Sequence, residues 1–141
     1  MDLTRRDVCA MGAGAAAVAA LGLPAFAATD EVATAIDEFT GGAEASEGGV
    51  SLNAPEIAEN GNTVPVEVSA EGAKRVMVLA AGNPRPGVVT FKFGPLAGSQ
   101  TASTRIRLAQ TQDLIAVAEM ADGSFARTTR QVKVTIGGCG G

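Results

Sequence analysis

From residue 64 onward, hydrophobic and polar side chains alternate with the period of two that is typical of half-buried β-strands. The first such segment, 64–70, places Val and Ala on one face. Its Pro65 favours an edge position, because proline cannot donate to a neighbouring strand. The segments that follow are either alternating (89–93, 103–108, 132–136) or continuously apolar, as central strands are (75–81, 114–120). Six or seven short strands in a chain of this length predict an all-β sandwich.

Two turns and one irregularity separate these strands. The run Asn83-Pro84-Arg85-Pro86-Gly87 predicts a turn, because each proline fixes φ and biases the residue before it away from helix. Asp122-Gly123 predicts a second, tighter turn. Phe125 is out of phase with the apolar residues of 132–136, so we expect a bulge or a bend between them.

Before the strands, residues 29–39 predict one short amphipathic helix, with acidic residues in its first turn and Gly41-Gly42 after its end. The residues that share its apolar face at spacings of three and four are Val32, Ala33, Ile36 and Phe39. An alternative is a leader that becomes ordered only on a partner. Residues 41–49 are rich in Gly, Glu and Ala and predict a linker or exposed loop.

The first 27 residues have the pattern of an export signal. Arg5 and Arg6 precede an apolar run at 8–23, and Ala25-Phe26-Ala27 is a small-residue cleavage site, so we expect cleavage before Ala28. A membrane anchor is the alternative, but the run is short and rich in Gly and Ala, so we expect no stable membrane association. The expected organisation is a signal peptide (1–27), helix and linker (28–49), sandwich (50–136) and terminal arm (137–141).

The charge is unevenly distributed along the chain. The net charge is −4, which argues against nucleic acid as the main partner. Residues 28–73 contain ten acidic residues and no Lys or Arg, whereas residues 74–141 contain nine basic and three acidic residues. A solvated acidic front explains this pattern, and so does a positive half that attracts anions or an acidic partner.

The residues available for chemistry are few. The sequence has no histidine, so the commonest general base and the commonest metal ligand are both absent. One cysteine in the mature chain and scattered carboxylates do not form a soft-metal site. Cys9 lies in the expected signal, so processing leaves Cys139 as the single thiol. A cysteine with no partner in its own chain, in an oxidising compartment, either forms an intermolecular disulfide or uses its thiol in the protein's function.

Cys139 lies in the terminal run Gly137-Gly138-Cys139-Gly140-Gly141. Glycine has no Cβ and ranges widely in φ and ψ, so these residues predict a thin, flexible arm. At about 3.3–3.6 Å per extended residue, the sulfur can reach roughly 10 Å beyond the last strand residue. No neighbouring residue favours the thiolate. The pattern therefore indicates a handle that other enzymes act on, without a catalytic residue or a cofactor in this chain.

These features resemble the SoxY family, the sulfur-carrying subunits of the bacterial Sox thiosulfate-oxidising system. The likeness rests on the terminal pentapeptide, the segment 4–9 that resembles a twin-arginine signal, the turn at 83–86 and the run 104–109 (Thr-Arg-Ile-Arg-Leu-Ala). It implies an immunoglobulin-like sandwich, export to the periplasm by the twin-arginine pathway after folding, and a heterodimer with a smaller β-sandwich subunit, SoxZ.

The same resemblance implies the chemistry and the remaining partners. Cys139 corresponds to the carrier cysteine, on which the c-type cytochrome SoxAX oxidatively couples thiosulfate to form a cysteine S-thiosulfonate. The dimanganese hydrolase SoxB then releases sulfate. The sulfane dehydrogenase SoxCD is a further candidate partner, for oxidation of the sulfur that remains.

Three alternatives stay open on the sequence. Cys139 could form a structural intermolecular disulfide. Gly140-Gly141 could be the site, as in carriers whose C-terminal Gly-Gly becomes a thiocarboxylate. Those carriers, however, are cytoplasmic and adopt an α/β fold. Arg105 and Arg107 share the polar face of one strand and could bind sulfur oxyanions, but a solvated strand face explains them better.

Overall fold

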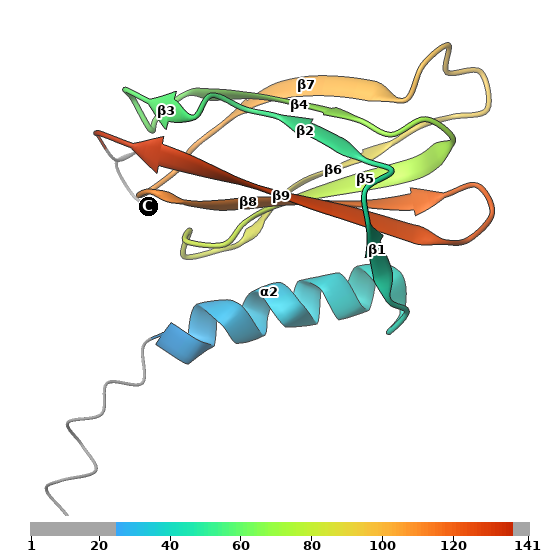
Figure 1. Ribbon diagram of the computed structural model, residues 1–141, viewed down its shortest axis with the longest axis horizontal. Helices are drawn as coiled ribbons and strands as arrows, with labels where there is room; N and C mark the ends of the chain where they lie inside the picture. The colour runs from blue at the N-terminus through green and yellow to red at the C-terminus, as the bar shows by residue number, and fades with distance from the viewer. Residues whose placement is uncertain (1–24, 137–141) are drawn as a thin grey trace, which may run out of the picture.

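The computed structural model of the protein describes residues 25–136, which form one helix and nine strands (Figure 1). Helix α2 runs from Ala25 to Thr40. The strands are β1 (Ala45–Glu47), β2 (Ser51–Asn53), β3 (Ile57–Ala58), β4 (Val64–Ser69), β5 (Ala73–Ala80), β6 (Gly87–Lys92), β7 (Thr101–Ile106), β8 (Gln112–Met120) and β9 (Phe125–Val134). Most of the expected signal peptide and the whole expected arm lie outside the described residues.

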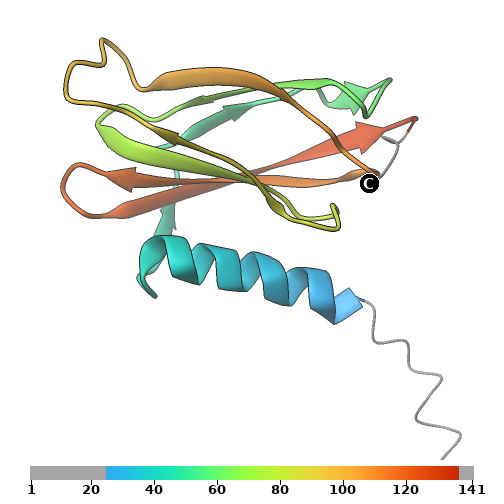
Figure 2. The same ribbon diagram turned by 180° about the vertical axis from the view of Figure 1, so that it is seen from behind.

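Two sheets face each other and form the predicted β-sandwich (Figures 1 and 2). The larger sheet has six strands in the order β1-β9-β8-β5-β6, with β3 also paired to β9, and the smaller has the order β2-β4-β7. Pairing is antiparallel except that β1 and β3 run parallel to β9. The predicted strands are confirmed, and β1, β2 and β3 are short additions that the periodicity did not reveal.

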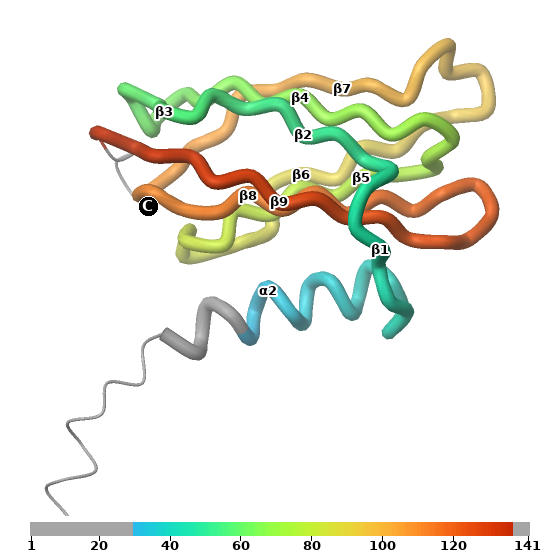
Figure 3. Tube along the Cα trace, in the orientation of Figure 1, coloured from blue at the N-terminus to red at the C-terminus, as the bar shows by residue number. Residues whose placement is uncertain are grey.

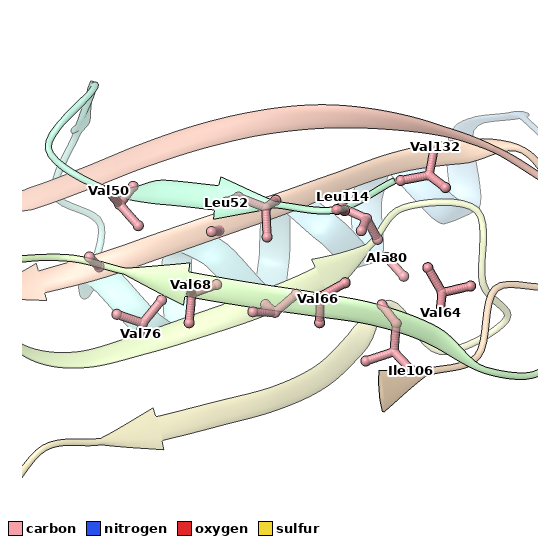
Figure 4. Close-up of a cluster of buried hydrophobic side chains, with 14 of the residues drawn as sticks. Val50, Leu52, Val64, Val66, Val68, Val76, Ala80, Ile106, Leu114 and Val132 are labelled. Carbon is pink, nitrogen blue, oxygen red and sulfur yellow. The ribbon is translucent and has the colours of Figure 1, made fainter. Parts of the chain in front are cut away.

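The space between the sheets is filled by aliphatic side chains (Figure 4). They come from alternate positions of the strands, as a period of two requires. Val64, Val76 and Leu114 are fully buried, one from each of β4, β5 and β8. Branched Val suits a pleated surface, and this core is built mainly of Val and Ala in place of aromatic side chains.

The outer face of the larger sheet is covered by α2, which lies beneath it in Figure 1. Val32 and Phe39 of the helix form a second apolar cluster with Met77, Leu79, Ile115 and Val117 of the sheet. This arrangement explains why the segments at 75–81 and 114–120 are apolar without alternation, since both of their faces are covered. Ala33 is exposed and Ala35 takes its expected place against the sheet, so that part of the helix prediction was wrong.

Phe125 packs against this second cluster, and its ring meets that of Phe39 edge-on at 6.2 Å between centroids. The expected bulge after Phe125 is absent from the described pairing, because β9 pairs with β8 in unbroken register from Phe125 to Val132. Phe125 is out of phase simply because it faces the helix, whereas Val132 faces the interior of the sandwich. The prediction of a bulge was wrong because it assumed that only one face of the strand was buried.

Arg75 connects the end of α2 to the sheet. Its guanidinium forms a salt bridge with Glu119, donates to the Phe39 carbonyl at 3.0 Å and lies 4.3 Å from the centre of the Phe39 ring. A cation at this position also suits the negative end of the helix dipole. These contacts hold the last turn of the helix on the sheet.

Three local expectations have mixed outcomes. The expected linker at 41–49 contains β1, which pairs with β9 and so is more ordered than its composition suggested. Pro65 lies in the middle strand of its sheet, but β2 pairs only with residues 67–69 of β4, so the position is an edge locally. The Asp122-Gly123 turn is confirmed, and hydrogen bonds from the Ser124 hydroxyl and backbone N–H hold the pKa of Asp122 below its ordinary value.

Candidate functional site

The predicted site residues Gly137, Gly138, Cys139, Gly140 and Gly141 all lie outside the described residues, so the structure tests none of them. What it does describe is the point from which they continue. We call residues 134–136, with the backbone groups they bond, the arm base. The chain trace shows this base at one end of the sandwich, together with β3 and the β5–β6 turn (Figure 3).

Backbone hydrogen bonds hold the arm base firmly. The Gly61 N–H donates to the Ile136 carbonyl at 2.7 Å, and the Thr135 N–H donates to the Ala58 carbonyl at 3.0 Å. On the other side, the Val134 N–H donates to the Thr111 hydroxyl at 2.9 Å. The arm base is therefore anchored by two separate segments of the chain, residues 58–61 and Thr111, which defines where the arm begins.

The 83–87 turn and the loop after β7 are joined by a network of amide side chains at the same end. Asn83 donates to the Arg107 carbonyl at 2.8 Å and accepts from the Ala109 N–H at 3.0 Å. Gln112 is buried, donates to Asn83 at 2.9 Å and accepts from the Gly82 N–H at 2.8 Å. The network satisfies backbone groups that neither strand nor helix can pair.

Gly61 connects the two parts of the site. Its carbonyl accepts from the Leu108 N–H at 2.8 Å, while its own N–H donates to Ile136. The arm base and the run 104–109 are thus separated by a single residue, and Asn83 is bonded to the same run. Two of the segments that carried the family resemblance, 83–86 and 104–109, therefore meet beside the arm base. The sequence did not predict the role of Gln112, whose only signal was a polar residue at the start of an apolar strand.

The surface around the arm base carries exposed apolar and cationic groups. Ile57 and Ile136 are 57% and 66% exposed, and Ile57 lines a shallow groove of about 450 Å³ with Pro55, Glu59 and other residues of the loop before β4. Arg105 and Arg107 are both exposed, and no salt bridge between described residues includes either. Their exposure matches the expected solvated strand face.

The described part of the chain offers neither a metal-binding cluster nor a membrane-spanning helix. Within residues 25–136 no group of three His, Cys, Asp or Glu side chains could hold a metal ion. In the same range no helix is long and apolar enough to cross a membrane.

An Asn83→Ala variant is expected to lower the free energy of unfolding by about 1–3 kcal/mol, because it leaves the Arg107 carbonyl and the Ala109 N–H without their partner. Urea denaturation followed by circular dichroism measures this difference. Asn53→Ala is the matched control, since Asn53 is exposed on β2, and it should change stability by no more than about 0.5 kcal/mol. Equal effects of the two variants would show that the network does not stabilise this end.

Comparison with known proteins agrees with this geometry. The family described as sulfur oxidation protein SoxY matches residues 36–139. The sulfur carrier protein SoxY from Chlorobium limicola f thiosulfatophilum is 34% identical with a TM-score of 0.67, and the match covers 77% of this chain and 99% of that one. No curated protein sequence matches the chain.

Two further structures share the fold at low identity. A superoxide reductase (neelaredoxin) from Ignicoccus hospitalis is 15% identical with a TM-score of 0.54, over 62% of this chain and 80% of that one. A putative superoxide reductase from Thermotoga maritima is 16% identical with a TM-score of 0.53, over 68% and 89%. These show a shared sandwich alone. The SoxY match, in contrast, extends through the whole sandwich and the arm base to Cys139, and this chain belongs to the SoxY family of sulfur oxidation proteins.

Proposed function

We propose that the protein is a non-catalytic sulfur carrier that holds thiosulfate-derived sulfur covalently on Cys139. The observation that carries the proposal is the family match, which ends at Cys139 itself. The similar Chlorobium protein is described as a sulfur carrier. The arm base supports the proposal, because a carrier needs a fixed point from which a slender segment can reach into another protein.

The proposed loading step forms one bond between the thiol sulfur of Cys139 and the outer sulfur of thiosulfate. The thiol proton is released and two electrons leave, with the c-type cytochrome SoxAX as the oxidant. The hydrolase SoxB then adds water to the sulfonate group, which departs as sulfate and leaves a sulfane sulfur on the cysteine. Where SoxCD is present, it oxidises that sulfur further.

Each role falls to a different part of the chain. Gly137, Gly138, Gly140 and Gly141 keep the segment around Cys139 narrow, since any side chain there would widen it. The sandwich supplies the docking surface for a SoxZ-like subunit and for the enzymes. Enzymes that must admit the arm would meet the exposed Ile57 and Ile136 at its base. The chain itself contributes no cofactor, and the sulfur adduct on Cys139 is cargo.

The proposed location is the periplasm, reached by the twin-arginine pathway after folding. Cleavage before Ala28 would leave Val32 and Phe39, the buried helix residues, in the mature protein. The helix layer would therefore survive processing. A pathway that exports folded proteins also suits a chain that leaves the cytoplasm together with its partner subunit.

Intact mass spectrometry tests the proposal. The mature protein is purified without reductant from cells that oxidise thiosulfate, and peptide mapping assigns the adducts. We expect sulfur or thiosulfonate adducts on Cys139 that a thiol reductant removes. A bare thiol, or a homodimer joined only by a disulfide, would contradict the carrier role and favour the structural alternative.

A further inference from the structure

The two sides of the sandwich differ in how their strand edges end. On one side lie β1, β2 and β3, which are three, three and two residues long. Very short strands are a common feature that prevents an edge from pairing with another chain. The opposite edges are β6 and β7, each six residues long. Figure 2 shows β6 and β7 on the near side of the molecule, away from β2.

The unpaired backbone groups of β6 can be assigned from its pairing with β5. Phe93 donates its N–H to the Lys74 carbonyl at 2.8 Å, and the register places Phe91 opposite Val76. Because antiparallel pairing alternates, the N–H and carbonyl groups of Thr90 and Lys92 point away from β5. Within residues 25–136 no strand other than β5 pairs with β6, so these groups have no strand partner there.

The same edge leaves apolar surface partly uncovered. Val88, Val89, Phe91 and Phe93 are only half-buried, although they pack against the interior of the sandwich. Leu96, in the connection from β6 to β7, is 96% exposed. A strand added beside β6 would cover the open flank of these side chains and pair with the free backbone groups at once.

The charge of this side favours an acidic partner. Residues 72–112 contain no Asp or Glu. Lys92 on β6, Arg105 on β7 and Arg107 just after β7 are exposed, and no salt bridge between described residues includes them. Acidic residues of α2 border β6 at its Gly87 end, through a shallow groove, and Glu67 of β4 lines another groove with Arg105. Lys92, which lies opposite Arg75, is therefore the cation on the β6 edge itself.

We propose that β6 pairs with the edge strand of a second β-sheet protein whose surface beside that strand is acidic. A second copy of this chain fits less well, because it would bring the same cations to the same edge. We take this partner to be the SoxZ-like β-sandwich subunit of the proposed function, and to that extent the inference rests on the proposed function. The arm base then remains free at the end of the sandwich.

A Thr90→Pro variant tests the pairing, with Thr90→Ala as its matched control. Proline removes an N–H that points outward and leaves the bonds to β5 in place. The probe is the SoxZ-like subunit of the same host, titrated by calorimetry against the mature chain. We expect Thr90→Pro to bind about tenfold or more weakly, since one or two bonds and their alignment are lost, and Thr90→Ala to bind within about twofold.

Further measurements keep the result interpretable if proline perturbs folding. Lys92→Glu should weaken binding by about fivefold or more at low salt, and the difference should shrink as salt screens the charges. Amide exchange of Thr90 and Lys92 should slow on binding. Unchanged affinity of Thr90→Pro, absence of any complex, or protection of these amides by self-association alone would overturn the inference. Sulfur loading of Cys139, measured separately by mass, reports on the proposed function independently.

Discussion

A Cys139→Ser variant is expected to fold like the unsubstituted protein and to carry no sulfur at all. Serine differs from cysteine by one atom, but its hydroxyl does not form a stable bond to sulfane sulfur under these conditions. Cys139 also follows the last strand in the sequence, so its change should leave unfolding by urea unaltered. The measurement is intact mass after exposure to thiosulfate and the loading enzymes, with thiosulfate consumption in cells as a second readout.

The control for this experiment moves the thiol elsewhere. A double variant, Cys139→Ser with Ser51→Cys, places a thiol at an exposed position of β2, within the sandwich and with Val50 and Leu52 as its direct neighbours. We expect it to remain unloaded, because a thiol on a wide surface cannot enter a narrow enzyme channel. Loading of the thiol at position 51 would show that the reactivity of a thiol alone decides whether it is loaded. Thiosulfate oxidation by cells that carry only Cys139→Ser would refute the carrier role of Cys139.

The sequence predicts most clearly the strands that have one buried face and one exposed face. The alternation of Val64, Val66 and Val68 identifies β4 because only one face of that strand is covered. The continuous apolar run of β5 has two covered faces, and the pattern alone cannot say what covers the second. The helix was predicted, but its place on the sheet was not. The out-of-phase Phe125 therefore predicted a bulge or a bend after it, whereas the residue belongs to the helix layer.

The site was predictable in one part and hidden in another. Four glycines around Cys139 at the end of the chain are a local signal that needs no fold to be recognised. The network of Asn83 and Gln112 depends on residues 29 positions apart that meet only after β5 and β8 have paired. Asn83 belongs to a predicted turn, but nothing in the sequence indicates that it meets Gln112. Such contacts follow from tertiary register, which hydrophobic periodicity does not encode.

The position of β6 illustrates how the two kinds of information combine. Its alternation predicted a strand, and the acid-free stretch around it was visible as a charge asymmetry. Only the sheet order shows that this strand is an open edge, and Figure 2 shows β7 on the same side of the molecule. The sequence left open whether the positive half attracts anions or a partner, and the free edge favours the partner.

The second prediction concerns the packing of the helix layer on the larger sheet. Leu79 is fully buried between the sheet and α2, where it packs in the cluster that contains Val32 and Phe39. A Leu79→Ala variant removes buried carbons and leaves a cavity that rigid strands cannot close. We expect it to lower the free energy of unfolding by about 2–5 kcal/mol, measured by urea denaturation of the mature protein.

Leu96→Ala is the matched control, because it deletes the same atoms from a side chain that is 96% exposed. It should change stability by no more than about 0.5 kcal/mol. A Leu79→Ala effect as small as that of Leu96→Ala would mean that α2 does not cover the sheet in solution. A large effect, together with a comparable loss for Phe39→Ala on the helix side, would establish the helix as a structural layer of the mature protein. The outer face of β5 and β8 would then be closed to partners, which leaves the β6 edge as the open side of the larger sheet.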